Sequence, residues 1–133
     1  MGAQRRVGVV LGLLVLAVWL PVLLAGVKSL RSRKRFGGSD VLIVTGAYRY
    51  VRHPLYAGWC FTLIGLGLVL GTPALVIIGF AWLLVTQVWS VHEERDLARR
   101  FGSEFAAYRR RTPRLIPDVR RVLLDLRRRR QRL

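Results

Sequence analysis

The stretch Pro54–Val91, PLYAGWCFTLIGLGLVLGTPALVIIGFAWLLVTQVWSV, contains no Asp, Glu, Lys or Arg in thirty-eight residues. A helix that crosses a bilayer needs about twenty mostly apolar residues. The stretch therefore predicts two short membrane-spanning helices, at about 55–70 and 74–90, joined by a turn at Gly71-Thr72-Pro73. Helices joined by so short a turn run antiparallel, so the residues before and after the pair emerge on the same side of the membrane.

A third apolar run, Val7–Leu24, follows a short basic lead and predicts a first spanning helix at about 7–24. A signal peptide has the same general plan, but this run is long for such a core and is followed by a poor cleavage site. The glycines of the second predicted span, Gly58, Gly65 and Gly67, favour close packing of helices. We therefore predict a single all-α integral membrane domain over residues 1–133, with one N-terminal span and a helical hairpin.

The basic residues flank these apolar runs. The chain has 23 Lys and Arg against 7 Asp and Glu, a net charge of +16, which in a soluble protein would indicate nucleic acid. Beside membrane spans, the same charge predicts anionic lipids as partners and no nucleic acid. The connector Val27–Asp40 has five positive charges and a helix-breaking Gly37-Gly38-Ser39, whereas the N-terminal lead has two. The positive-inside rule therefore predicts a cytoplasmic connector.

Residues 91–133 are predicted to form a cytoplasmic C-terminal region. A stripe of residues spaced by three and four predicts an amphipathic helix that ends at Thr112-Pro113, and its members are Glu94, Leu97, Phe101, Phe105 and Tyr108. Asp118–Leu133 forms a second amphipathic segment, which ends in Arg127–Arg130. Such a segment is predicted to lie on an anionic bilayer surface.

Two polar stretches flank the hairpin: Thr45–Gly58, TGAYRYVRHPLYAG, and Val91–Pro117, VHEERDLARRFGSEFAAYRRRTPRLIP. They contain an R-H-P-x-Y core, a Glu-Glu pair, an F-G-x-E-aromatic-x-x-Y run and a closing R-x-I-P, in that order. With these four motifs the chain resembles, over about residues 40–117, the isoprenylcysteine carboxyl methyltransferase and phospholipid methyltransferase superfamily. Its members are integral membrane enzymes that use S-adenosylmethionine.

The resemblance implies a set of site residues. Those that match cofactor-contacting positions are Tyr48, His53, Pro54, Leu55, Tyr56, Glu93 and Glu94. Arg114 and Pro117 match the closing loop, as structural or lid residues, and no catalytic residue is assigned. The family pattern places the cofactor-contacting carboxylate at Glu93, whereas the helical phase puts Glu94 on the apolar stripe, so both remain candidates.

The residues themselves are suited to such a cofactor, which offers an adenine face, ribose hydroxyls, an ammonium and a carboxylate. Pro54 favours an extended backbone at His53 and so turns the imidazole away from the following helix. Two adjacent carboxylates at a bilayer edge are costly unless they have partners, and a bound ammonium is one such partner. The alternative is that Arg52 and His53 anchor headgroups and that the carboxylates start a helix. With one cysteine, Cys60, and two histidines, the sequence gives no metal-ligand spacing, and the resemblance implies no metal.

The function that the resemblance implies is that of a membrane methyltransferase, isoprenylcysteine carboxyl methyltransferase-like, acting on a lipophilic acceptor. Isoprenylcysteine methyltransferases have a substrate-contacting arginine four residues before the cofactor-contacting glutamate, and here that position is Trp89. Two alternatives therefore stay open: a phosphatidylethanolamine-type N-methyltransferase, and a non-enzymatic membrane protein that binds anionic lipid. The acceptor group, carboxylate or amine, is also open. The Arg-rich composition favours a bacterial cytoplasmic membrane, with the active site on the cytoplasmic face.

Overall fold

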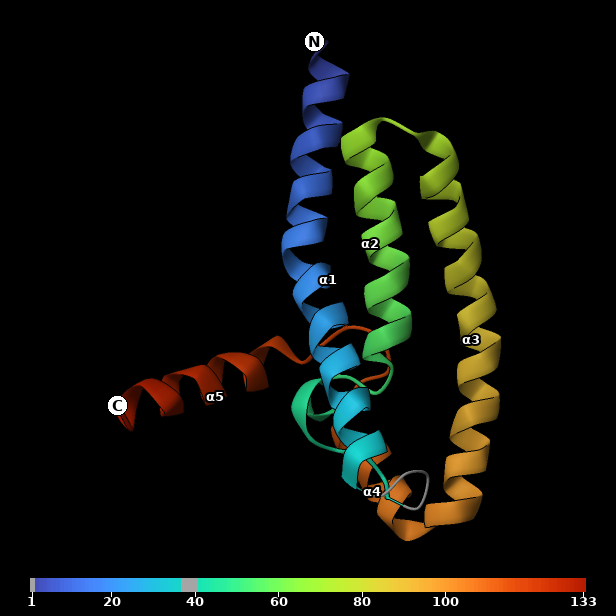
Figure 1. Cartoon of the computed structure of the whole chain (residues 1–133), viewed down its shortest axis with the longest axis vertical. Helices are drawn as coiled ribbons and strands as arrows, with labels where there is room; N and C mark the ends of the chain where they lie inside the picture. Colours follow the sequence, from blue (N-terminus) through green and yellow to red (C-terminus); the bar gives the residue numbers. More distant parts are fainter. Residues whose placement is uncertain (1, 37–40) are drawn as a thin grey trace.

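The computed structural model describes residues 2–36 and 41–133, and the described residues form helices and no strand, which confirms the all-α prediction. The elements are α1 (Ala3–Phe36), the 3-10 helix η2 (Gly46–Arg49), α2 (Pro54–Leu70), α3 (Pro73–Phe101), α4 (Ser103–Arg111) and α5 (Val119–Gln131). Helices α1, α2 and α3 lie side by side with α2 in the middle (Figure 1). Helix α4 lies at one end of this bundle, and α5 points away from it.

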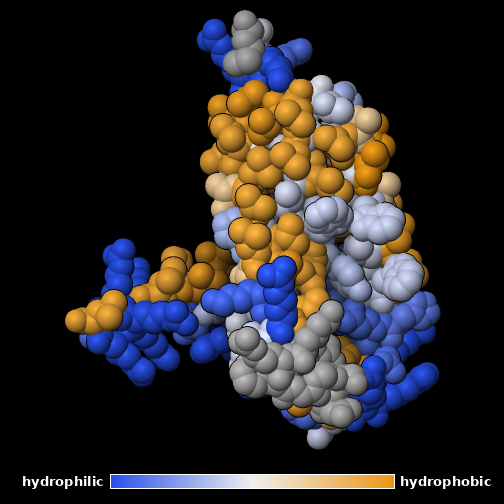
Figure 2. Space-filling view, in the orientation of Figure 1, coloured by the Kyte–Doolittle hydropathy of each residue, from blue (hydrophilic) through white to orange (hydrophobic). Residues whose placement is uncertain are grey.

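Two helices of the described part are long and apolar enough to cross a membrane: Ala3–Ser32 and Pro73–Phe101. Helix α2, with 17 residues, is apolar but shorter. On the face shown in Figure 2, apolar surface covers much of the three-helix bundle, hydrophilic surface gathers at its ends, and α5 carries both kinds. The structure therefore agrees with a membrane fold, in which α2 corresponds to the predicted span at 55–70.

Two helices extend beyond the spans that were predicted within them. Helix α1 continues past residue 24 to Phe36, through most of the predicted connector, while Gly37-Gly38-Ser39 lies outside the described residues. Helix α3 continues past residue 90 to Phe101. Lys, Arg and Glu are good helix formers, so a run of charges marks the end of an apolar segment without ending the helix.

The predicted amphipathic helix over residues 91–112 is broken at Gly102, which has a φ of +50°. Glycine adopts this left-handed region without steric cost, so the chain changes direction between α3 and α4. The stripe that begins at Glu94 nevertheless faces the protein interior. Phe105 and Tyr108 pack with Leu42 in a small core cluster, as packing residues, and Glu94 is buried beside them.

The turn between α2 and α3 forms at Gly71-Thr72-Pro73, as predicted, and the two helices run antiparallel. Thr72 precedes α3, but its side chain makes no capping hydrogen bond. Pro73 is the first residue of α3, where its missing N–H costs no helical hydrogen bond. The polar stretches before α2 and after the apolar part of α3 therefore meet at one end of the bundle.

Glycine allows α1 and α2 to approach closely, as the sequence predicted for Gly58 and Gly65. A Cβ atom at Gly58 would lie 2.8 Å from the Cα of Leu23, and one at Gly65 would lie 2.9 Å from the Cγ of Leu16. Trp19 stacks on Phe61 between them, with ring centroids 4.4 Å apart. Helix α2 thus packs closely against one face of α1.

The C-terminal segment is fastened to the residues that precede α2. The backbone N–H groups of Arg52 and His53 donate to the carbonyl oxygens of Pro113 and Arg114, at 2.9 and 3.1 Å. The N–H of Asp118 donates to the carbonyl oxygen of Tyr50 at 3.1 Å. Segments about sixty residues apart in sequence are therefore held together by backbone hydrogen bonds.

Candidate functional site

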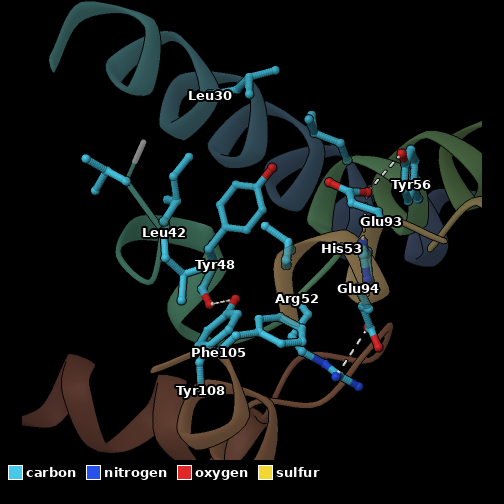
Figure 3. Close-up of a pocket in the computed structure, with 14 residues that line it drawn as sticks. Leu30, Leu42, Tyr48, Arg52, His53, Tyr56, Glu93, Glu94, Phe105 and Tyr108 are labelled. Carbon is cyan, nitrogen blue, oxygen red and sulfur yellow. Dashed lines mark hydrogen bonds and ion pairs between the residues drawn. The ribbon is translucent and has the colours of Figure 1, made fainter. Parts of the chain in front are cut away.

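A cavity of about 230 Å³ lies where the two polar stretches meet (Figure 3). Its lining side chains come from α1, from the segment before α2, from the first turn of α2, from the end of α3 and from α4. They are Leu30, Val41, Leu42, Ile43, Tyr48, Arg52, His53, Leu55, Tyr56, Glu93, Glu94, Leu97, Phe105 and Tyr108. We call this cavity the pocket. Apolar walls with a few converging polar groups are typical of small-molecule sites.

Glu94 stands at the centre of a buried ionic cluster. Its carboxylate, only 4% exposed, accepts a hydrogen bond from His53 Nε2 at 2.9 Å. Arg52 Nη1 lies 3.2 Å from its Oε1, and Arg114 Nη2 donates to its Oε2 at 3.3 Å. A buried carboxylate is tolerated only when it is paired and hydrogen-bonded. The charge of Glu94 is therefore balanced within the protein, and Arg114 of the closing loop contributes to this balance.

His53 lies between the two glutamates and is almost fully buried. A carboxylate can only accept, so His53 Nε2 donates its N–H to Glu94. Nδ1 of the same ring lies 3.8 Å from Glu93 Oε2. The ring stacks on Tyr56, with centroids 5.5 Å apart and an interplanar angle of 15°. Its orientation is therefore fixed on two sides.

Glu93 has a different environment from its neighbour. Its side chain is 47% exposed, and it accepts a hydrogen bond from the Tyr56 hydroxyl at 3.1 Å. Figure 3 shows Glu93 and Tyr56 together at one end of the pocket. The adjacent carboxylates thus differ: Glu94 is enclosed by cations, and Glu93 remains accessible to a ligand.

Arg52 has hydrogen-bonding capacity that the protein does not use. The side chain is 11% exposed, and among the described residues its buried Nε and Nη1 atoms have no hydrogen-bond partner. The 3.2 Å approach of Nη1 to Glu94 is an ion pair without hydrogen-bond geometry. Burial lowers the pKa of Arg52, against the opposing effect of Glu94, but a guanidinium remains charged. Unused buried donors are costly, so they suit an anionic group of a ligand.

Tyr108 holds Tyr48 at the pocket. Its hydroxyl donates to the carbonyl oxygen of Tyr48 at 2.6 Å, and its ring packs against Phe105. Burial raises the pKa of Tyr108, so its hydroxyl stays protonated and keeps donating at neutral pH. In Figure 3 the Tyr48 ring lies along the pocket wall, where it offers an aromatic face.

Six of the predicted site residues line the pocket together: Tyr48, His53, Leu55, Tyr56, Glu93 and Glu94. Pro54 is buried as the first residue of α2, Arg114 of the closing loop pairs with Glu94, and Pro117 does not line the pocket. Sequence reasoning did not assign Leu30, Leu42, Leu97 or Phe105 to the site. The last two share the helical stripe of Glu94, which could have identified them, whereas Leu30 and Leu42 carry no sequence signal.

Within the described ranges, no group of three His, Cys, Asp or Glu side chains is placed to hold a metal ion. Cys60 is buried in α2. The chemistry available at the pocket therefore comes from carboxylates, guanidinium groups, an imidazole and aromatic rings.

Comparison with known proteins identifies relatives. The family model for phospholipid methyltransferase matches residues 6–104. Human protein-S-isoprenylcysteine O-methyltransferase is 34% identical over 94 residues, which cover 66% of this chain and 31% of that protein. Methanethiol S-methyltransferase of Crocosphaera subtropica is 36% identical over 76 residues, covering 54% and 28%. The cobalt-zinc-cadmium resistance protein CzcN of Cupriavidus metallidurans is 34% identical over 84 residues, covering 61% and 38%. The matches span about a third of the length of these relatives, and no solved structure matches the chain significantly.

Proposed function

The chain belongs to the phospholipid methyltransferase family, and from this premise we propose that it is an S-adenosylmethionine-dependent methyltransferase of the membrane. We propose that residues 1–133 act as one domain with three spans in a bacterial cytoplasmic membrane, with the pocket on the cytoplasmic face. Its acceptor is a lipophilic molecule that enters from the bilayer. The observation that carries the proposal is the contrast at the pocket between the accessible carboxylate of Glu93 and the unused N–H groups of Arg52.

The residues of the pocket fit this cofactor. Its amino-acid end has an ammonium and a carboxylate, which the Glu93 carboxylate and the Arg52 N–H groups complement. Tyr48 and Tyr56 supply aromatic faces for the adenine. At about 230 Å³ the pocket is smaller than the roughly 300–1,000 Å³ of typical ligand sites. Tyr56 and Glu93, whose hydrogen bond joins α2 to α3, are the side chains that must separate to enlarge it.

When bound, S-adenosylmethionine supplies a methyl group activated by a positively charged sulfur. The protein contributes position and the exclusion of water. Leu30, Leu42 and Leu97 line the pocket with apolar surface. Glu94 is a positioning residue, because it holds His53 by the Nε2 hydrogen bond and directs Nδ1 towards Glu93. A carboxylate acceptor needs no general base, whereas an amine acceptor needs one, for which His53 and the glutamates of the pocket are the candidates.

The acceptor group has two candidates. A carboxylate acceptor corresponds to the isoprenylcysteine relatives, but Trp89 occupies the position of their substrate arginine and is 66% exposed on α3. An amine acceptor of the phosphatidylethanolamine type needs a general base, and His53, whose Nδ1 lies 3.8 Å from Glu93, is a candidate for it. The non-enzymatic alternative, a protein that only binds anionic lipid, gives no reason for this arrangement.

The test is isothermal titration of S-adenosylhomocysteine into the protein in lipid nanodiscs. We expect saturable binding by the wild type and binding at least about tenfold weaker in Glu93→Gln, because the amide loses a charge-assisted contact. Asp96→Asn is the matched control, since Asp96 is an exposed carboxylate on the same helix, paired with Arg100. It should bind as the wild type does.

Absence of binding by folded wild type would leave the non-enzymatic lipid-binding protein as the better explanation. Equal binding by Glu93→Gln and the wild type would contradict the role proposed for Glu93. With binding established, methyl transfer from labelled S-adenosylmethionine to N-acetyl-S-farnesylcysteine or to phosphatidylethanolamine distinguishes the two acceptor groups.

A further inference from the structure

A second cavity, of about 610 Å³, lies on the opposite side of α1 from the pocket, between α1, η2 and α5. Leu30 of α1 lines the pocket, whereas its neighbour Ser29 lines this cavity. Its lining residues are Pro21, Val22, Ala25, Lys28, Ser29, Ser32, Thr45, Gly46, Ala47, Arg49, Tyr50, Val51, Pro117, Val122 and Arg129. We call this cavity the basic cleft.

The basic cleft changes from apolar to cationic along α1. Its apolar end is formed by Pro21, Val22 and Ala25, and its polar end begins at Lys28. These residues recur at helical spacing and so share one face of α1. At 1.5 Å per residue, Lys28 lies about 10 Å beyond Pro21 along the helix axis. Lys28 is also the first charged residue after Arg6, so it marks the level at which α1 leaves the apolar layer.

The charges of the basic cleft are unbalanced. The residues that line the cleft include three cations, Lys28, Arg49 and Arg129, and no acidic residue. Arg49 is paired with Asp125 at 3.3 Å. Among the described residues, neither the Lys28 ammonium nor the Arg129 guanidinium has a hydrogen-bond or ion-pair partner. An anionic group would therefore complement this end of the cleft.

Helix α5 indicates the surroundings in which the cleft lies. It runs across the direction of α1, away from the bundle (Figure 1). Val119, Leu123 and Leu126 share one face of α5 and are exposed. A helix with such an apolar face and many arginines lies in the interface between headgroups and acyl chains. The cationic end of the cleft then lies among the phosphates.

We propose that the basic cleft binds one anionic phospholipid, with its phosphate between Lys28 and Arg129 and its glycerol and upper acyl chain against Pro21, Val22 and Ala25. A free phosphate ion would use the cationic end alone, whereas a phospholipid uses both ends. The proposal does not depend on the methyltransferase function, because the pocket lies on the other side of α1.

The test is native mass spectrometry of the detergent-purified full chain, titrated with phosphatidylglycerol or with phosphatidylcholine of the same acyl chains. We expect phosphatidylglycerol to bind the Lys28→Gln/Arg129→Gln variant on the order of twentyfold more weakly than the wild type, from the contribution of each cation near a lipid phosphate. The control variant Arg127→Gln/Arg130→Gln removes two charges from the same helix outside the cleft. It should keep affinity within about twofold.

The variant Ala25→Trp distinguishes a lipid from a free ion. The indole fills the apolar end of the cleft and should weaken phosphatidylglycerol binding at least about tenfold. Soluble glycerol phosphate, which can use only the cationic end, should compete weakly with phosphatidylglycerol for the wild type. The proposal would be overturned if Lys28→Gln/Arg129→Gln and Arg127→Gln/Arg130→Gln lost the same affinity for phosphatidylglycerol, or if the wild type bound phosphatidylglycerol and phosphatidylcholine equally. Either result would indicate diffuse electrostatic attraction of lipid to the whole helix. If Ala25→Trp bound phosphatidylglycerol as tightly as the wild type, and glycerol phosphate competed fully, the cleft would recognise only the phosphate and the proposed lipid site would be wrong. Lys28 is exposed, so the single variant Lys28→Gln serves if the double variant does not fold.

Discussion

The pocket and the basic cleft share α1 as a wall but differ in whether their charged side chains are paired within the protein. In the pocket, the buried carboxylate of Glu94 is surrounded by His53, Arg52 and Arg114. In the cleft, two cations have no partner among the described residues. A charge balanced inside the protein contributes to folding, whereas an unbalanced surface charge contributes mainly to what the protein binds. Substitutions in the two cavities should therefore have different effects on stability.

The largest effect is expected for Glu94→Gln. The amide removes the only negative charge at the centre of the cluster and leaves the Arg52 and Arg114 guanidinium groups facing each other. Removing one partner of a buried pair costs about 3 kcal/mol of unfolding free energy. Tryptophan fluorescence during unfolding in detergent measures it. Asp96→Asn breaks an exposed pair and should cost no more than about 1 kcal/mol. Equal costs would mean that the cluster is not a stabilising centre.

Gly58→Val should have the next largest effect and should alter both cavities. A Cβ at this position lies 2.8 Å from the backbone of Leu23, so α1 must move away from α2. Overpacking of this kind costs about 1–3 kcal/mol. The same unfolding measurement checks the cost, and titration with cofactor analogue and with lipid checks the two cavities. Gly2→Val is the control, because nothing lies within 4 Å of a Cβ there. An unchanged unfolding free energy in Gly58→Val would contradict close packing of α1 on α2.

Lys28→Gln/Arg129→Gln should change stability by less than about 0.5 kcal/mol in lipid-free detergent, because neither cation has a partner to lose. The wild type and the variant should differ in unfolding temperature once phosphatidylglycerol is added. A ligand that binds only the folded state raises the unfolding temperature, so the wild type should gain stability and the variant should gain little. A large loss of stability without lipid would show that these cations stabilise the fold, which would contradict the contrast drawn between the two cavities.

The smallest effect concerns the attachment of α5 near the cleft. The Tyr50 hydroxyl donates to Asp125 at 2.8 Å, and burial, followed by this hydrogen bond, raises the pKa of Tyr50 above its ordinary value of 10.0. Because the pKa is raised on folding, the contact contributes fully below pH 10 and is lost as the pH rises through the folded value. The difference between the absorbance titrations of the wild type and Tyr50→Phe gives the pKa of Tyr50 in the folded protein. In Asp125→Asn the midpoint should move down towards 10, and an unchanged midpoint would exclude Asp125 as a cause.

Much of the fold could be predicted because it depends on local composition. The uncharged stretch and its Gly-Thr-Pro turn predicted α2, α3 and their antiparallel arrangement, and this arrangement brings the two polar stretches to one end. The ends of α1 at Phe36 and of α3 at Phe101 could not be predicted from hydropathy, because it reports the solvent around a residue and not its backbone conformation. The break at Gly102 depends on a single backbone angle.

The site was predicted where a motif supplied the side chain and missed where packing supplied it. His53, Tyr56, Glu93 and Glu94 lie in recognisable patterns and line one pocket. Leu30 reaches the same pocket because α1 continues beyond its apolar run, which the sequence did not indicate. The helical phase placed Glu94 on the apolar stripe without deciding between the two glutamates, and its enclosure by Arg52 and Arg114 depends on contacts between distant segments. The environments that distinguish the two glutamates are therefore a tertiary property.

The backbone hydrogen bonds from Arg52 and His53 to Pro113 and Arg114 also have a consequence for biosynthesis. A chain is made from its N-terminus, so all three apolar helices are synthesised before these carbonyl groups exist. Until then Glu94 lacks Arg114, and the residues before α2 lack the backbone acceptors of the closing loop. The site can therefore form only after the sequence of all three helices is complete. A chain halted before Pro113 would present an unstable protein, open to the proteases that remove unfinished products.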